Sequence, residues 1–173
     1  MDDIAFAARR GKTSLYYYFK NKEEIFQEVV DNESDKLKTS IIEAVSLKES
    51  AEEKLTVYIQ TRMQILKELA VFYDAIRHEL FDHLSFINKA RQSFDQEETM
   101  LLVQILDSGV KKNELFIPDP ELSAKTIIMI LKGVEVQLFV EPIEQSDLKI
   151  KLNEIISIII NGLKRKGQNN LKN

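Results

Sequence analysis

Residues that interrupt helices are scarce in this sequence, and this scarcity constrains the fold more than any other feature. Among 173 residues there are five glycines and three prolines. These two residues are the least favourable in a helix interior, so long uninterrupted helices are expected. Apolar residues recur at spacings of three and four almost throughout, and no strand pattern extends beyond a few residues. The sequence therefore predicts an all-α fold.

The apolar spacing divides the chain into several predicted helices. The predicted segments are 25–45, 55–70, 75–84, 101–106, 120–140 and 146–166, with a loop at 111–118. Asp119 can cap the helix that follows it, and Pro120 occupies the first turn, where its missing N–H costs nothing. Pro142 favours an end to that helix near residue 140.

Composition excludes several classes of protein. The chain has no cysteine, so disulfides and cysteine-ligated zinc are excluded, and no cofactor is predicted. No apolar stretch approaches the length of a membrane span, and the start Met1-Asp2-Asp3 has the wrong charge for a secretory signal. We therefore expect a soluble, cytoplasmic protein that does not associate with membranes.

Charge is unevenly distributed along the chain. The net charge is −4, but residues 1–22 contain five basic and two acidic groups, a local charge of +3. The rest of the chain has 19 basic and 26 acidic groups, a net charge of −7. A basic end on an acidic body suits a protein that contacts phosphate with that end alone. Five basic residues in 22 are equally compatible with ordinary surface.

The first 22 residues have the local pattern of a helix-turn-helix. Ile4, Ala5 and Ala8 share one face of a short helix, and Gly11 suits a turn because it adopts a positive φ without steric cost. A second short helix is predicted over residues 12–19.

This second helix has two different faces. Leu15 and Phe19 form an apolar pair on one side, whereas Thr13 and Tyr17 lie on the opposite side. A short helix with an apolar inner face and a hydroxyl-bearing outer face suits the major groove of DNA.

A further helix start follows at Asn21. Asn21 can cap this helix, with Glu24 three residues later as in a capping box. Lys22 lies in the first turn, where a cation is unfavourable unless the helix end faces an anion such as phosphate. On these residues alone, a solvated lysine is the simpler interpretation.

The segment from Met1 to Phe26 resembles the DNA-binding signature of the TetR family, the tetracycline-repressor type of transcriptional regulator. The most specific part is the run Leu15-Tyr16-Tyr17-Tyr18-Phe19, followed by Lys22 and by Ile25-Phe26. The resemblance implies that Lys12, Thr13 and Tyr16 contact bases, and that Ser14, Tyr17 and Lys22 contact the DNA backbone. The loop Asn113-Glu114-Leu115-Phe116 resembles the family's Gly-Glu-Phe turn, with Asn113 at the glycine position.

The resemblance also implies a domain organisation and a mechanism. Residues 1–24 would form a partial helix-turn-helix domain, and residues 25–173 a ligand-binding and dimerisation domain. Family members are homodimeric repressors, released from a palindromic DNA operator by a small-molecule inducer. They have a further helix before the point where this sequence starts, so we expect this 173-residue form to bind operator DNA poorly. Gel shifts that compare it with an N-terminally extended form would test this expectation.

The last two predicted helices have apolar residues on more than one side. In 146–166, two adjoining apolar stripes imply burial on two sides, which favours a four-helix dimer interface over a central helix of a monomer. Gly133 would allow close approach of the backbones. The predicted interface residues are Ile127, Leu131, Gly133, Val134, Leu138, Leu152, Ile155, Ile156 and Ile159.

The resemblance places a small-molecule pocket among the middle helices. The candidate lining residues are Tyr58, Met63, Phe72, Tyr73, Arg77, His78, Phe81, Phe86 and Met100, with His83 as a further polar candidate. Aromatic and methionine residues at helical spacing are more often plain core. The pairs His78/Asp82 and Glu79/His83 could ligate a metal, but a solvated polar face is the better interpretation, and no metal is predicted.

An enzyme and a helical interaction module are the two alternatives to a repressor. An enzyme is not expected, because the sequence has no glycine-rich phosphate loop and no nucleophile–base–orienter set. A helical dimeric interaction or ligand-binding module, with impaired or no DNA binding, is the alternative to the repressor. Salt-dependent, sequence-specific DNA binding would distinguish the two.

Overall fold

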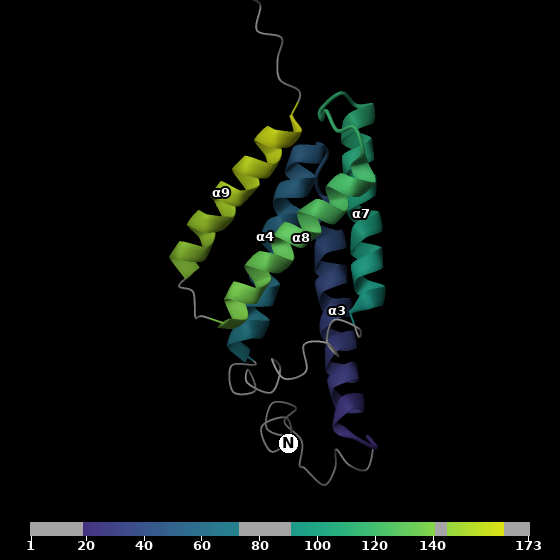
Figure 1. Ribbon diagram of the computed structural model, residues 1–173, viewed down its shortest axis with the longest axis vertical. Coiled ribbons are helices and arrows are strands. Elements are labelled where there is room, and N and C mark those ends of the chain that lie inside the picture. The colour runs from purple at the N-terminus through teal and green to yellow at the C-terminus, as the bar shows by residue number, and fades with distance from the viewer. Residues whose placement is uncertain (1–18, 73–90, 141–144, 165–173) are drawn as a thin grey trace, which may run out of the picture.

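The computed structural model describes residues 19–72, 91–140 and 145–164, and within these ranges the chain is helical (Figure 1). The helices are α3 (Lys22–Ser46), α4 (Ala51–Phe72), α7 (Gln92–Lys111), α8 (Pro120–Val140) and α9 (Gln145–Leu163). The described part has no strand, and one isolated antiparallel bridge joins Leu115 to Lys164. The all-α prediction is confirmed.

The predicted helices agree with the observed ones, but most are longer than predicted. The 120–140 prediction has the observed bounds of α8, and α3 extends the 25–45 prediction by three residues at its start. The largest difference is at α7, where the prediction of 101–106 covers only the centre of Gln92–Lys111. The predicted segment 75–84 lies outside the described residues.

Two predicted helix caps are present. The Oδ1 atom of Asn21 accepts a hydrogen bond from the Glu24 backbone N–H at 2.8 Å, and Glu24 Oε2 accepts one from the Lys20 N–H at 2.8 Å. The Oδ1 atom of Asp119 accepts from the Leu122 N–H at 2.9 Å. These side chains satisfy N–H groups that have no partner within their own helix, which fixes where α3 and α8 begin.

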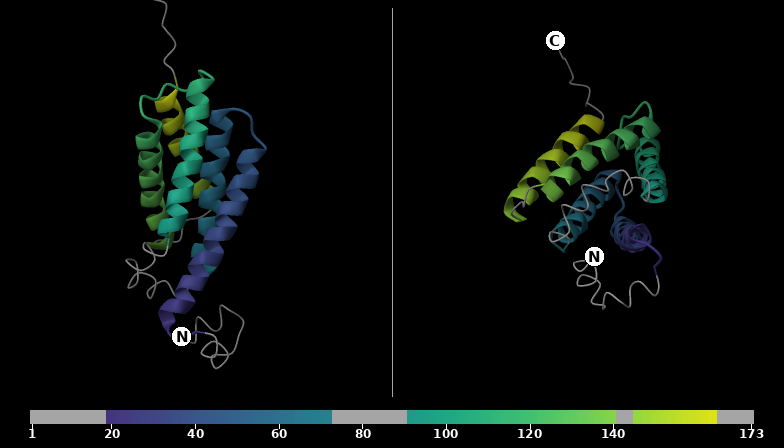
Figure 2. Two further views of the ribbon diagram at one scale, coloured as in Figure 1. Left: turned by 90° about the vertical axis from the view of Figure 1, so that its right-hand side faces the viewer. Right: turned by 60° about the horizontal axis from the view of Figure 1, so that its bottom comes forward.

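Helix α4 is central in the bundle, since it packs against each of the other four described helices. Helices α8 and α9 lie on one side of α4, and α3 lies on another side (Figures 1 and 2). Helix α7 packs against α3, α4 and α8 and so closes the remaining side. The first turns of α3 project beyond the other described helices (Figure 1).

The core runs the length of the bundle between these helices. Its side chains are almost entirely leucine and isoleucine, with Tyr58 and Met63 near the middle. At the loop end, Gly109 is needed for close packing, because an added Cβ would lie 2.6 Å from the Ala51 Cβ. Asn113 has a φ of 61°, which confirms that asparagine takes the left-handed position expected for the turn after α7.

Candidate functional sites

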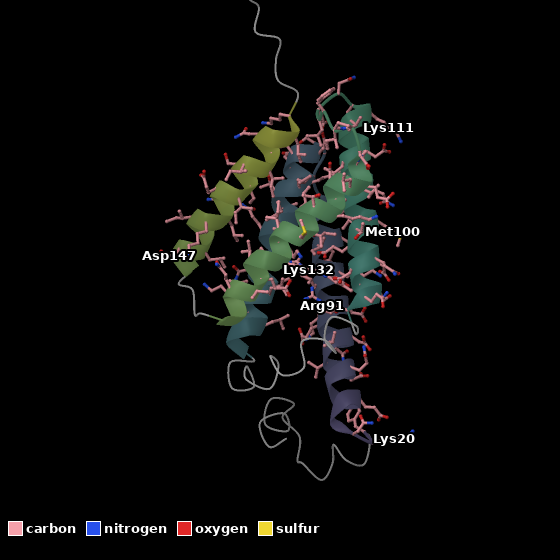
Figure 3. The ribbon with its side chains drawn as sticks, in the orientation of Figure 1. Lys20, Arg91, Met100, Lys111, Lys132 and Asp147 are labelled. Carbon is pink, nitrogen blue, oxygen red and sulfur yellow. The ribbon has the colours of Figure 1, made fainter. Side chains whose placement is uncertain are left out.

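The N-terminal end of α3 is the first candidate site. No residue that the structure describes between 27 and 36 is buried, and the core begins at Leu37. The first turns of α3 therefore extend out of the bundle, with Lys20 at the end (Figure 3). Lys12, Thr13, Ser14, Tyr16 and Tyr17 lie outside the described residues, and only the helical backbone of Lys22 is described. Their assignment to DNA remains a prediction.

The second candidate site is a network of charged side chains in the middle of the bundle, which the sequence analysis did not predict. Arg62 on α4 is 0% exposed. Its Nε atom donates to Glu98 Oε1 on α7 at 2.8 Å, and its Nη2 atom donates to Glu135 Oε2 on α8 at 3.0 Å. One guanidinium group thus joins three helices through buried, charge-assisted hydrogen bonds.

Burial and charge act in opposite directions on Arg62. Burial by itself lowers the pKa of Arg62, but the carboxylates of Glu98 and Glu135 raise it above its ordinary value. Burial and the Glu98 carboxylate raise the pKa of Tyr58 well above 10.0. The Tyr58 hydroxyl therefore stays protonated and donates to Glu98 Oε1 at 2.8 Å.

Glu135 lies between two guanidinium groups. Its Oε2 atom accepts from Arg62, and its Oε1 atom accepts from Nη1 of Arg91, the residue just before α7. Burial by itself raises the pKa of Glu135, but Arg91 and Arg62 outweigh this and hold the pKa below 4.5. Arg91 also stacks on Phe94, with its Cζ atom 5.6 Å from the ring centre.

At the edge of the network, Lys132 on α8 donates to Asp95 Oδ2 on α7 at 2.5 Å. Figure 3 places Arg91 and Lys132 close together in the body, far from Lys20 and Lys111 at its two ends. We call Arg62, Arg91, Asp95, Glu98, Lys132 and Glu135 the ionic network. It contains three basic and three acidic groups and is therefore balanced in charge.

Three buried polar atoms of the ionic network have no hydrogen-bond partner among the described residues. They are Arg91 Nη2, Asp95 Oδ1 and Glu98 Oε2. Buried polar atoms in native proteins are nearly always hydrogen-bonded, so each exception requires an explanation.

A signal for this network is present in the sequence. Arg62 falls four residues before Leu66, within the apolar stripe of α4. Glu98 falls midway between Phe94 and Leu102, and Glu135 four residues after Leu131, again on buried stripes. A charge at a stripe position in three different helices predicts charges that pair inside the core.

The predicted pocket residues are only partly brought together. Tyr58 and Met63 are buried, and Met63 Sδ lies 3.6 Å from Arg62 Nη1. Met100 is not brought together with them: it is 57% exposed and points away from the bundle, because the inward face of α7 is taken by Glu98 and Leu102 (Figure 3). The side chain of Phe72 is not described. The remaining candidates, Tyr73, Arg77, His78, Phe81, His83 and Phe86, lie outside the described residues.

Most of the predicted dimer residues contribute to the core of the single chain, and their role in a dimer stays a prediction. Within a single chain the structure already buries Ile127, Leu131, Leu138, Leu152, Ile156 and Ile159. These side chains pack on the chain's own core, because α8 and α9 both turn this stripe toward α4. Val134 and Ile155 are partly buried at the edge of that core, so they too contact it.

A different set of apolar residues on α8 and α9 faces outward. The exposed large side chains include Met129 (67%), Val136 (53%) and Ile158 (64%). We define the outer apolar face as Met129, Ile130 and Val136 on α8 together with Ile150 and Ile158 on α9. Gly133 lies among the α8 residues, and an added Cβ there would meet nothing within 4 Å. These exposed side chains are a second set of candidates for a dimer contact on the two helices.

Two negative findings concern the described residues. They include no group of three or more acidic, histidine or cysteine side chains placed to hold a metal ion. None of their helices has an apolar stretch long enough to cross a membrane.

Comparison with known proteins supplies the context for these sites. Residues 1–29 match the family model described as bacterial regulatory proteins, tetR family. The comparison with curated proteins gave no match. Several solved structures share the fold.

Three of these structures show the extent of the likeness. A transcriptional regulator from Cytophaga hutchinsonii is 23% identical with a TM-score of 0.74, over 95% of this chain and 88% of that one. The TetR family regulator PfmR from Thermus thermophilus is 19% identical with a TM-score of 0.71, over 93% and 87%. The ketosteroid transcriptional regulator KstR2 of Mycobacterium tuberculosis is 17% identical with a TM-score of 0.64, over 94% and 83%.

Proposed function

We propose that the chain is a DNA-binding transcriptional regulator of the TetR family, not an enzyme, and that it is a repressor that a small molecule releases from its operator. In this proposal residues 1–24 belong to the DNA-binding domain, and residues 25–173 form the ligand-binding and dimerisation domain. Such a regulator acts in the cytoplasm, where bacterial DNA lies.

The match of residues 1–29 to the family model is the observation on which this proposal depends. It includes the positions proposed to contact bases, Lys12, Thr13 and Tyr16, and those proposed to contact the backbone, Ser14, Tyr17 and Lys22. The capped start of α3 supports the proposal, because it fixes the junction between this segment and the body.

A homodimer is proposed through the outer apolar face. Five exposed apolar side chains on two adjacent helices lose contact with water when a second copy covers them, which favours association. A two-fold dimer presents two identical DNA-binding ends, which must lie about 34 Å apart to enter successive major grooves. A palindromic operator is the expected target.

Helix α3 is proposed to transmit the response to ligand. It is a single helix of 25 residues that begins beside the DNA-binding segment and packs on α4 and α7 in the body. A ligand that binds better to a body with a wider separation of the two ends would shift the population away from the DNA-bound form. The ligand can act only through this difference in affinity.

Operator selection from random DNA, followed by fluorescence anisotropy, tests the proposed function. We expect a palindromic sequence to be selected and its binding to weaken steeply with salt. Thr13→Ala should weaken binding about tenfold or more if Thr13 contacts a base. Thr39→Ala, at an exposed position within α3, is the matched control and should leave binding unchanged. Selection of no sequence, or binding insensitive to salt, would favour an interaction module instead.

A further inference from the structure

The three open atoms of the ionic network point to a specific ligand chemistry. Arg91, Asp95 and Glu98 are spaced four and three residues apart, so they share one face of the start of α7. Their separation along the helix axis is about 10 Å, at 1.5 Å per residue. The open atoms are thus one donor, Arg91 Nη2, followed along the chain by two acceptors, Asp95 Oδ1 and Glu98 Oε2.

The other hydrogen bonds of the network hold this surface in place. Glu98 Oε1 accepts hydrogen bonds from Tyr58 and Arg62. These bonds orient the carboxylate and do not involve its Oε2 atom. Arg91 uses its Nη1 atom for Glu135, which fixes the direction of Nη2. Both open atoms thus belong to side chains that are already oriented by neighbouring helices, as a preorganised binding site requires.

The charge balance of the network limits which ligand can bind. The three basic and three acidic groups already compensate one another, as their ion pairs show. A buried carboxylate or ammonium group from a ligand would add an uncompensated charge, which is strongly unfavourable away from water. An uncharged hydroxyl or amide group can donate to Glu98 Oε2 or accept from Arg91 Nη2 without disturbing this charge balance.

Buried apolar side chains adjoin the ionic network along its helices. One helical turn from the network lie the buried side chains of Leu66, Phe94, Leu102, Leu131 and Leu138. A ligand that reaches the open atoms therefore needs an apolar portion next to its polar group.

We propose that the open face of the ionic network recognises the effector, and that the effector is a mainly apolar, uncharged molecule bearing a hydroxyl or primary amide group. This inference rests on the proposed function for the existence of an effector. It assigns the chemistry by which that effector is recognised, at Arg91, Asp95 and Glu98.

A matched ligand series tests the inference on the full chain. Octan-1-ol, octanamide, octanoate and octylamine have the same carbon count and differ in polar group and charge. By calorimetry, the alcohol and the amide should bind about tenfold or more tightly than the two ions. Equal binding of all four, tightest binding of an ion, or no binding of the neutral pair would overturn the inference. The last outcome would indicate that water alone occupies the open atoms.

Two variants provide an independent test because each changes the charge balance. Arg91→Met leaves the network with one excess negative charge, so octan-1-ol should bind about tenfold more weakly and octylamine more strongly. Glu98→Gln leaves one excess positive charge, so octanoate should gain affinity. Lys111→Met, at the exposed far end of α7, is the control and should change neither preference (Figure 3). Unchanged ligand preferences in both folded variants would contradict the inference.

Operator binding measured on the same samples separates the two proposals. If the chain binds its selected operator but the neutral ligands do not bind, the ligand inference fails and the proposed function stands. If no operator is selected, the proposed function fails whatever the ligands do.

Discussion

The ionic network and the outer apolar face reverse the usual arrangement of a helical bundle, in which apolar side chains lie inside and charged side chains lie outside. Inside the bundle, Arg62 and Glu98 are charged and fully enclosed, whereas outside it Met129 and Ile158 are apolar and mostly exposed. Charges are normally solvated and large apolar side chains are normally covered. Each region therefore departs from the usual distribution of charged and apolar side chains.

The ionic network and the outer apolar face would be satisfied by different kinds of partner. The network already has its charges paired, and what remains open is three hydrogen-bonding atoms, which a small polar group can satisfy. The outer apolar face has no polar requirement and needs only a surface that excludes water. This difference supports a small molecule for the first region and a second copy of the chain for the second.

Removal of Arg62 should have the largest effect. Arg62→Met leaves Glu98 and Glu135 buried without their shared partner, and the free energy of unfolding should fall by about 3–5 kcal/mol. Denaturation with urea measures it. Lys125→Met, which breaks an exposed pair with Glu121 on α8, is the control and should leave the midpoint unchanged. A loss below about 1 kcal/mol for Arg62→Met would mean that water reaches the network.

A charge on the outer apolar face should have the next largest effect. Val136→Glu places a carboxylate twice at the proposed two-fold interface, where each buried apolar side chain contributes roughly 1.5–3 kcal/mol. The dimer dissociation constant should rise about 100-fold or more, as measured by sedimentation. Leu47→Glu, at an apolar residue that is 80% exposed but lies between α3 and α4, should not change it. An unchanged dimer in Val136→Glu would remove this face from the interface.

Local features of this fold could be predicted from sequence, and the reason is physical. The caps at Asn21 and Asp119, the first-turn Pro120 and the left-handed Asn113 depend on contacts within a few residues. Such short-range interactions are visible in the order of the residues. The bounds of α8 followed directly from them.

Long-range features were harder to predict because they depend on which side of a helix meets which neighbour. The partners of Arg62 are 36 and 73 residues away, so local spacing could indicate buried charges but not which of them pair. The apolar residues of α8 indicated two covered sides, but not which stripe faces α4. Leu131 was therefore assigned to the dimer and is buried in the core, while Met129 faces outward.

Acid should weaken the interior without affecting the outer apolar face. The pKa of Glu135 in the folded chain lies below its ordinary value of 4.5, so its ionised form stabilises the fold at pH above about 4.5. This stabilisation is lost as the pH falls through the folded-state value. Glu135→Gln should therefore cost about 1–3 kcal/mol at pH 7 and progressively less below pH 4.5.

Urea denaturation of both proteins from pH 7 to pH 3 measures this difference. Glu121→Gln, at the exposed start of α8, is the matched control and should follow the wild-type stability at every pH. A difference between Glu135→Gln and wild type that stays constant with pH would show that Glu135 does not act through its charge.

The smallest effect on stability is expected for the ion pair between Lys132 and Asp95, which lies where the buried interior meets solvent. The Lys132 and Asp95 side chains are 38% and 24% exposed, so water screens their ion pair, unlike that of Arg62. Lys132→Met should lower the free energy of unfolding by about 0.2–1 kcal/mol, and raised salt should reduce the difference further. Urea denaturation at low and high salt measures both, with Arg62→Met as the reference that salt should not rescue. A salt-independent loss of several kcal/mol for Lys132→Met would show that the Lys132 pair is as shielded from water as that of Arg62, and the boundary between buried charge and solvent would then lie further out on α8.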